Sequence, residues 1–163
     1  MTIAIRPFHE PDRPYLQGVY LRCRQQSFHW LEPSELQLAD FDSLIVGEQV
    51  LVLCLDTVPV GFAGIWQEDS FLHSLFIAPE YKGQGLGRIL LAACMPYFSQ
   101  RATLKCHRQN HGARGFYQHL GWQCLQQVED HQGGYWLMAA PPATPASAAA
   151  RPTDRPLPPG AAD

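Results

Sequence analysis

The stretch "EYKGQGLGRILL", residues 80–91, places three glycines at alternate positions directly after an apolar run, and it decides how we interpret the fold. The run before it, "SLFIAP", is typical of a buried strand, and the residues after it have the spacing of an amphipathic helix. Glycine adopts backbone conformations that other residues avoid and lets a ligand approach the main chain closely. The start of a helix also presents unpaired N–H groups and the positive end of its dipole. The turn therefore predicts a phosphate site formed by the backbone, with a tight ligand-free connection as the alternative.

Two common phosphate-binding motifs do not fit this turn. A Walker loop requires Lys followed by Ser or Thr after its last glycine, and Arg88 and Ile89 stand there instead. A dinucleotide fingerprint beginning at Gly83 requires a glycine at position 88 and an acidic residue about 20 positions further on, where Lys105 lies. The pattern indicates another kind of phosphate site.

Hydrophobic periodicity on both sides of the turn predicts a mixed α/β sheet. A short helix is expected from Ser34, as its cap, to Leu38. The helix over 85–98 connects its neighbouring strands in a parallel crossover. The other expected elements are a strand at 2–8, a helix from 11 to about 28, a hairpin of 49–56 and 58–68, strands at 71–79 and 102–107, a helix at 110–121 and a terminal hairpin of 122–129 and 134–140.

Length and composition restrict the class of protein. A chain of 163 residues with 46% hydrophobic residues is sufficient for one compact domain. It has neither a long apolar span nor the layout of a secretion signal, so we expect a cytoplasmic protein that does not contact a membrane. The net charge of −3 argues against nucleic acid as a partner. The five cysteines are scattered singly, which predicts buried thiols and no metal site.

Basic residues are frequent around and after the glycine turn. They could form one basic patch beside it, or they could be ordinary surface charges. The residues concerned are Lys82, Arg88, Lys105, Arg108 and Arg114.

The C-terminal segment from 141 to 163 differs in composition from the rest of the chain. It is rich in proline and alanine and has a single large aliphatic residue, Leu157. Such a segment cannot bury enough apolar surface to offset its ordering entropy, so we expect a disordered tail after a folded domain at 1–140. A proline-rich docking segment is the alternative interpretation.

Two motifs together carry a resemblance to a known family. The stretch "LFIAPEYKGQGLGRILL" at 75–91, followed by "N..A..FYQHLGW" at 110–122, resembles the GNAT superfamily of acyl-CoA-dependent N-acyltransferases. That family's phosphate loop usually opens with Arg or Gln, and Lys82 is a departure at a position where the contact is largely through main-chain amides. The order of elements agrees over residues 2–140. The resemblance implies a single α+β domain whose mostly antiparallel sheet has about seven strands, a central splayed parallel pair and about four helices.

The resemblance also implies acetyl-CoA (coenzyme A) as the cofactor. Its pantetheine arm would lie between the splayed strands, and the amides of 83–88 would hold its pyrophosphate. The cofactor-binding residues implied in this way are Leu75, Phe76, Ile77, Lys82, Gly83, Gln84, Gly85, Leu86, Gly87, Arg88, Asn110, Ala113, Phe116 and Tyr117.

Catalysis by direct attack of an amine on a thioester needs an acid and a base. Tyr117 is the implied acid, because a phenol is suited to protonate a thiolate; a tyrosine that caps the core is the alternative. His73 is the first candidate for the base, since an imidazole accepts a proton near neutral pH, although strand histidines are often packing residues. Glu68, with the neighbouring Asp69, is the runner-up. Some family members carry a Glu where this chain has Lys105.

The acceptor pocket implied by the resemblance is walled by "SFHWLEP", residues 27–33, with Phe28, His29 and Trp30 as substrate-binding candidates. Packing of these rings over the sheet is the alternative. The expected activity is transfer of an acetyl group to a primary amine of a small molecule or peptide. A catalytically weak acyl-CoA-binding sensor or partner module is the second hypothesis. Dimers are frequent in the resembled family, so a homodimer is also an expectation.

Overall fold

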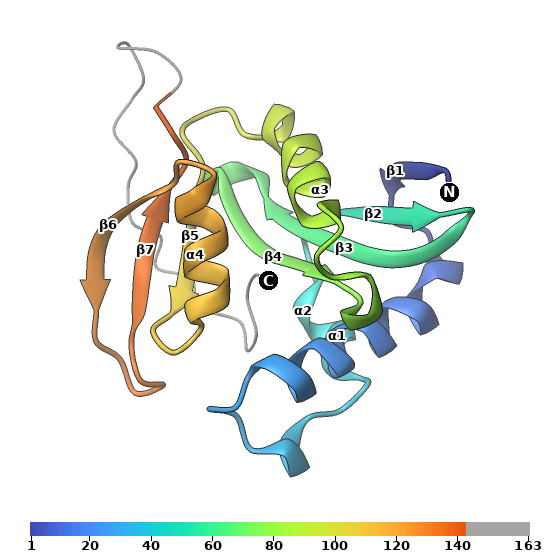
Figure 1. Ribbon diagram of the computed structural model, residues 1–163, viewed down its shortest axis with the longest axis horizontal. Helices are drawn as coiled ribbons and strands as arrows, with labels where there is room; N and C mark the ends of the chain where they lie inside the picture. The colour runs from blue at the N-terminus through green and yellow to red at the C-terminus, as the bar shows by residue number, and fades with distance from the viewer. Residues whose placement is uncertain (143–163) are drawn as a thin grey trace.

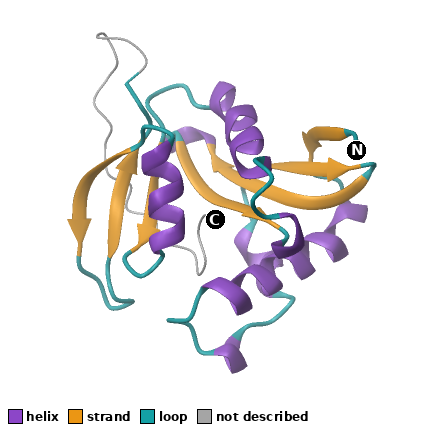
Figure 2. Cartoon of the chain, in the orientation of Figure 1, coloured by secondary structure: helices purple, strands orange, loops and turns teal. Residues whose placement is uncertain are grey.

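A computed structural model describes residues 1–142, so the predicted tail lies almost wholly outside the described residues. Within that part the chain forms seven strands and four α-helices (Figures 1 and 2). The elements are β1 (Ile3–Pro7), α1 (Arg13–Ser27), α2 (Asp40–Leu44), β2 (Gln49–Leu55), β3 (Val58–Trp66), β4 (Phe71–Ile77), α3 (Leu86–Cys94), β5 (Thr103–His107), α4 (His111–His119), β6 (Gln123–Val128) and β7 (Tyr135–Ala139).

The strands form one sheet in the order β1-β2-β3-β4-β5-β7-β6. All neighbours are antiparallel except β4 and β5, which are parallel and aligned only at Phe71 and Thr103. Beside that pair, the Thr103 N–H donates to the Ser70 carbonyl at 3.0 Å. Because paired strands keep a constant spacing, a single shared pair means that the two strands diverge beyond it. Figure 1 shows the result, a gap between the β1–β4 half and the β5–β7 half of the sheet. The predicted mixed sheet and parallel pair are confirmed.

Helices cover both faces of the sheet. On one face, Tyr20 of α1 meets the rings of Phe62 and Phe76 edge-on, at centroid distances of 6.2 and 5.1 Å. We call this side the α1 face. On the opposite side, Ile77 of β4, Leu86 of α3 and Phe116 of α4 line a common pocket, so α3 and α4 lie on the same side of the sheet.

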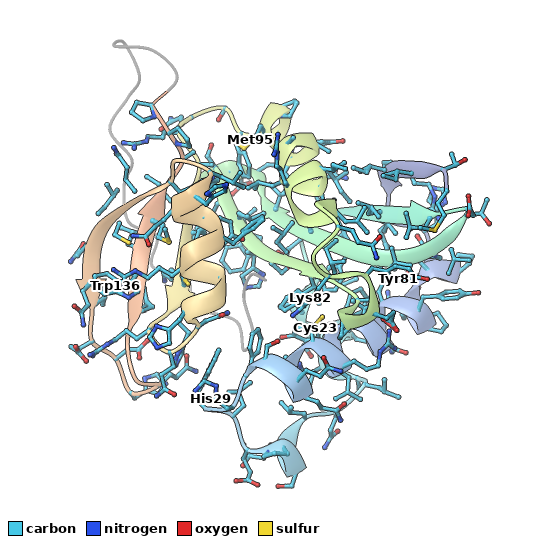
Figure 3. All side chains as sticks on the ribbon, viewed as in Figure 1. Cys23, His29, Tyr81, Lys82, Met95 and Trp136 are labelled. Carbon is cyan, nitrogen blue, oxygen red and sulfur yellow. The ribbon has the colours of Figure 1, made fainter. Side chains whose placement is uncertain are left out.

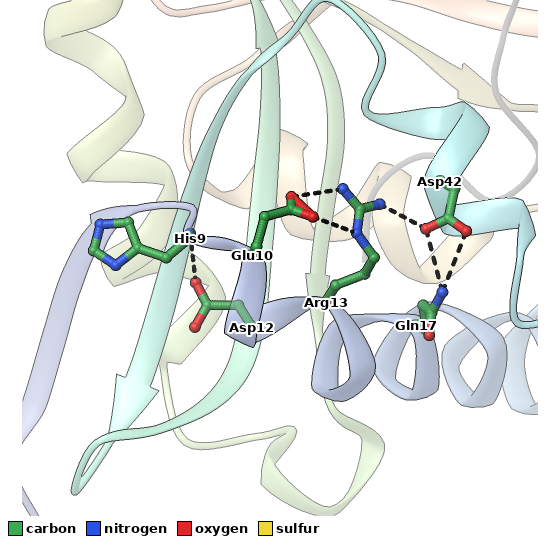
Figure 4. A network of polar contacts seen from close by, with 6 residues as sticks. All are labelled: His9, Glu10, Asp12, Arg13, Gln17 and Asp42. Carbon is green, nitrogen blue, oxygen red and sulfur yellow. Dashed lines mark hydrogen bonds and ion pairs between the residues drawn. The ribbon is translucent and has the colours of Figure 1, made fainter.

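Two arginine–aspartate pairs fix α2 against α1. Arg13 Nη1 lies 2.6 Å from Asp42 Oδ1, and Gln17 also donates to that carboxylate at 3.2 Å (Figure 4). Arg24, whose side chain is 1% exposed, lies 2.9 Å from Asp40 Oδ2. Both aspartates stand in the first turn of α2, where negative charge also suits the helix dipole.

The predicted helix from Ser34 to Leu38 is wrong. Only a 3₁₀ turn forms there, over Pro33–Glu35, and the Ser34 side chain does not cap it. The α-helix begins later because the Asp40 carboxylate accepts a hydrogen bond from the Gln37 N–H at 2.9 Å and is held by the arginine from α1. The start of this helix is therefore set by a contact distant in sequence.

The remaining predicted elements are found near their expected bounds, and the helix after the glycine turn ends at Cys94, before Pro96. No helix in residues 1–142 combines the length and apolar character needed to cross a membrane.

Candidate functional site

The glycine turn has the left-handed backbone conformation that its sequence predicts. Gly83 and Gly85 both have φ of +79°, and Gly85 is the N-cap of α3. A Cβ atom built at either position would meet no other atom within 4 Å. Glycine is therefore required there by backbone conformation, and the space in front of the turn is open. Gly87 lies in the first turn of the helix.

A pocket of about 410 Å³ opens beside this turn. It is bounded by the end of β4, the glycine turn with the start of α3, and the first half of α4. Figure 3 places Lys82 beside the last part of α1, where Cys23 lies, and Lys82 Nζ donates to Ser27 Oγ at 3.1 Å. The lining residues are Ile77, Tyr81, Lys82, Gly83, Gly85, Leu86, Gly87, Arg88, Gly112 and Phe116. The pocket thus brings together most of the residues predicted to hold a cofactor.

The other predicted cofactor residues do not line this pocket. Asn110 caps α4, where its Oδ1 accepts from the Ala113 N–H at 3.2 Å, as its residue type predicts. Gln84 is exposed in the turn. The residues Leu75, Phe76, Ala113 and Tyr117 are all buried in the core.

Tyr117 is fully buried in α4. Its ring contacts Phe116 at 5.1 Å and Trp122 at 5.4 Å between centroids. The alternative of a tyrosine that caps the core with its hydroxyl in water is therefore wrong, because the whole side chain is buried.

A bulge in β4 determines where His73 lies. Gly64 pairs with Ser74 and the next residue of β3 pairs with Leu72, so His73 is an extra residue without a counterpart in β3. Bulges of this kind redirect a side chain. The His73 ring stacks on Trp66, with centroids 3.9 Å apart and planes inclined by 21°.

Glu48 is a functional candidate that sequence reasoning missed. Its Oε1 lies 2.7 Å from His73 Nδ1, and both side chains are buried, with 0% and 7% exposure. Glu48 precedes β2 and lies over Gly64 of β3, where a Cβ would be 2.7 Å from Oε1. The signal in the sequence was Gly64 itself, since a glycine within a buried strand often marks a close approach by another group.

Glu68 is not part of this arrangement. It lies exposed in the 3₁₀ turn Gln67–Asp69 between β3 and β4. The buried carboxylate next to His73 belongs to a residue from a different part of the chain.

An aromatic bridge crosses the gap on the α1 face. Phe28 lies 6.1 Å from Phe76 of β4 and stacks on Trp30 at 4.7 Å. Trp30 in turn stacks on His107 of β5, at 4.4 Å and 10°. The bridge therefore joins the ends of the two diverging strands. His29, between the two bridging residues, is exposed and meets Trp30 edge-on.

His107 is held in place by hydrogen bonds at both of its ring nitrogens. Its Nδ1 accepts from the Gln109 N–H at 3.1 Å, and its Nε2 lies 2.8 Å from the Gln132 carbonyl, to which it donates. With one nitrogen donating and the other accepting, both are engaged in hydrogen bonds.

Of the two interpretations left open for the five basic residues, a single patch beside the glycine turn does not hold. Lys105 is buried at 4% exposure and its Nζ lies 5.0 Å from the centre of the Tyr135 ring. Arg108 pairs with Glu129 at 2.6 Å, and Arg114 lies over the Trp136 ring. Only the two remaining basic residues of the group, Lys82 and Arg88, line the pocket at the glycine turn.

The cysteines match the expectation of buried thiols. Four of the five are buried and Cys124 is half-buried. Burial raises the pKa of the Cys94 and Cys106 thiols to about 12, so neither supplies a thiolate nucleophile near neutral pH.

The divided sheet, with a glycine turn opening the helix that follows β4, is the arrangement that the resemblance to GNAT acetyltransferases implied. The acetyltransferase (GNAT) family matches residues 5–122, which is more than half of the chain, and the protein belongs to that family.

Two known sequences and one solved structure are similar to this chain. A protein of Bacillus subtilis (strain 168), provisionally named a ribosomal protein bS18-alanine N-acetyltransferase, is 34% identical over 79 residues, covering 45% of this chain and 52% of its own length. An uncharacterized N-acetyltransferase of Archaeoglobus fulgidus is 29% identical over 124 residues, covering 69% of this chain and 80% of its own. The crystal structure of the PaiA N-acetyltransferase of Thermoplasma acidophilum in complex with coenzyme A superposes with a TM-score of 0.68 at 20% identity, over 86% of this chain and 99% of that one.

Proposed function

We propose that this protein transfers an acetyl group from acetyl-CoA to a primary amine of a small molecule or peptide, within a ternary complex. The observation that carries the proposal is the open pocket at the glycine turn, whose lining includes Ile77 at the end of β4. The buried His73–Glu48 pair lies on the same strand, beside the gap between β4 and β5. Family membership and the fold shared with a coenzyme A complex support the choice of cofactor.

The glycine turn suits the diphosphate of the cofactor. Its backbone is free to face a ligand because no side chain occupies the space beyond Gly83 and Gly85. The amides of 83–88 open α3 and would bind phosphate oxygens with the help of the helix dipole. Lys82 and Arg88, both exposed at the pocket, add positive charge at the same place.

The gap between β4 and β5 suits an extended ligand with amide groups. Strand edges that do not pair with each other can accept a further strand-like chain. Main-chain groups of Leu75, Phe76 and Ile77 would hold the pantetheine arm, and one N–H would polarise the thioester carbonyl. Asn110 and Ala113 would contribute from the start of α4. The bound thioester supplies the activated acetyl group.

His73 is the base in this proposal, and Glu48 positions it. When Nδ1 donates to the Glu48 carboxylate, the other ring nitrogen, Nε2, carries the lone pair. That nitrogen accepts the proton that the attacking amine loses. The buried Glu48 carboxylate stabilises the imidazolium that results, and this favours removal of the proton from the amine as it attacks the thioester.

Tyr117 is the acid. It belongs to α4, on the side of the sheet opposite the α1 face, so base and acid approach the gap from opposite sides. The amine nitrogen bonds to the carbonyl carbon, the carbon–sulfur bond breaks, and the Tyr117 hydroxyl donates a proton to the departing sulfur.

The acceptor would enter from the α1 face, where Phe28 and Trp30 cross the gap and His29 stands exposed at the entrance. The name of the Bacillus subtilis relative adds a peptide that begins with alanine to the acceptors worth testing.

Release of free thiol from acetyl-CoA tests the proposal. The full chain is assayed with a panel of small amines and alanine-initiated peptides, beside calorimetric titration with coenzyme A. Tyr117→Phe should reduce turnover at least about tenfold and leave coenzyme A affinity within about threefold. Tyr97→Phe, which removes a hydroxyl from the turn after α3, is the matched control and should be unaffected.

Three outcomes contradict parts of this proposal. Absence of coenzyme A binding removes it altogether. Binding without turnover across a wide panel favours the sensor hypothesis. Unchanged turnover in Tyr117→Phe removes the acid assignment alone.

A further inference from the structure

The α1 face of the gap carries opposite charges on its two sides. Lys105 lies on β5, two residues beyond the shared pair at Thr103, and His73 with its Glu48 partner lies two residues beyond Phe71 on β4. An ammonium group therefore stands on one side and a carboxylate on the other.

The direction of Lys105 follows from its neighbours. In β5, alternate residues face the same side, and His107 contacts Trp30 on the α1 face. Lys105 shares that side and lies over Tyr135, the strand partner of His107. The intervening Cys106 points the other way, with its Sγ 3.7 Å from the carbonyl of Asn110 at the start of α4.

Two buried hydroxyl groups lie on the same face of the gap. Ser74, at 1% exposure, lies beside Glu48, and Thr103, at 2%, is the α1-face residue before Lys105 on β5. Neither hydroxyl has a hydrogen-bond partner within residues 1–142. Buried hydroxyls are normally paired, so these two indicate a polar ligand between the strands.

The aromatic bridge limits where that ligand can lie. Phe28 and Trp30 close the end of the gap where the strands are furthest apart, and the shared pair closes the other end. The acceptor would therefore lie on the α1 face between the stacked rings and the shared pair.

We propose that the acceptor is a small amine that also bears a carboxylate, in the manner of a free α-amino acid, and that Lys105 binds this carboxylate while the amine faces His73. The inference rests on the proposed acetyl transfer. A zwitterion matches both charges, since its ammonium lies toward Glu48 and its carboxylate toward the lysine. A peptide N-terminus offers a neutral amide at that place, and a polyamine would bring a second cation beside Lys105.

The test compares each free amino acid with its own carboxamide. The full chain is assayed for thiol release with matched pairs such as alanine and alaninamide, and with an alanine-initiated peptide. We expect kcat/KM to be at least about tenfold higher for the acid than for the amide of the preferred pair. In Lys105→Met this ratio should fall to about one, whereas Lys105→Arg should keep most of it.

Lys82→Met is the control, because it removes a lysine at the glycine turn. It should weaken coenzyme A binding and leave the ratio of acid to amide unchanged. A merely structural role of Lys105 would lower both rates together without changing their ratio. Circular dichroism checks that each variant is folded.

Outcomes for the two proposals remain distinct. If amides or peptides are acetylated as well as acids, the transfer activity stands and the inference is wrong. If no amine is acetylated, the same pairs are titrated into the protein with and without coenzyme A. Equal affinity for acid and amide, or no binding of either, then overturns the inference.

Discussion

Gly64→Ala is the sharpest test of the buried pair, because it acts on Glu48 without altering either ionisable residue. The new methyl group would stand 2.6 Å from Ser74 Oγ and 2.7 Å from Glu48 Oε1. Ordinary contact begins near 3.4 Å, so the carboxylate must retreat by about 0.7 Å. Gly64 lies in a strand paired on both sides, so the side chains have to move.

The expected cost follows from the bond that is lost. The His73–Glu48 contact of 2.7 Å would stretch beyond hydrogen-bonding distance. A hydrogen bond to a charged group is worth about 1.5–3 kcal/mol, which corresponds to about a 10- to 150-fold loss in kcat if the bond is fully formed in the transition state. The crowding should also lower the free energy of unfolding by about 1–3 kcal/mol.

The assay measures kcat by thiol release at a temperature where the variant is fully folded, together with the Kd for coenzyme A, which should not change. Gly115→Ala is the matched control, because a Cβ there meets nothing within 4 Å. It should be neutral or stabilise α4 by up to about 1 kcal/mol. Glu48→Gln should reproduce the loss of rate without the added methyl group. A folded Gly64→Ala protein with the turnover of the parent would refute the positioning role of Glu48.

Three further predictions concern stability, reactivity and the glycine turn. The Arg6 guanidinium donates two hydrogen bonds of 2.8 Å to the buried Asp12 carboxylate and holds the pKa of that carboxyl below its usual range. The stability that this pair gives the folded protein is therefore complete above about pH 4 and is lost as the pH falls through the lower pKa of the folded state. Asp12→Asn should therefore lower the free energy of unfolding at neutral pH by about 2 kcal/mol and flatten its acid dependence in denaturant titrations; an unchanged acid limb contradicts this. Because burial raises the pKa of Cys94 and Cys106, only the half-buried thiol should react with Ellman's reagent near pH 8 before denaturation, and rapid reaction of several thiols in the native protein would show the core to be open. Gly85→Ala, at φ of +79°, should lower Tm by about 3–6 °C and weaken coenzyme A binding at least about tenfold by calorimetry, and unaltered affinity would place the diphosphate elsewhere.

Local pattern was sufficient for much of the fold. The strands follow from alternation or continuous apolar runs, and the conformation of the turn at Gly83 and Gly85 follows from their lack of a side chain. The cap at Asn110 likewise depends on residues within one helical turn. Each of these features is determined by neighbours in sequence, so the sequence alone could predict it.

The features that could not be predicted depend on contacts between distant residues. Glu48 reaches His73 across the full width of β3, and only Gly64 hinted at that approach. The start of α2 depends on Arg24 of α1, which binds Asp40, so the helix begins there and not at Ser34. Lys105 was one of several basic residues close in sequence, but the alternation of side chains along β5 places it on the α1 face, away from the glycine turn.

The single shared pair between β4 and β5 has a mechanical consequence. A continuous ladder transmits force and order across a whole sheet, but here the two halves meet at one rung and at a few stacked rings. An extended molecule bound between β4 and β5 would form hydrogen bonds with both strand edges and so connect the two halves of the sheet. Binding of such a molecule would then also make the sheet more rigid, and the ligand-free protein would be the more flexible of the two forms.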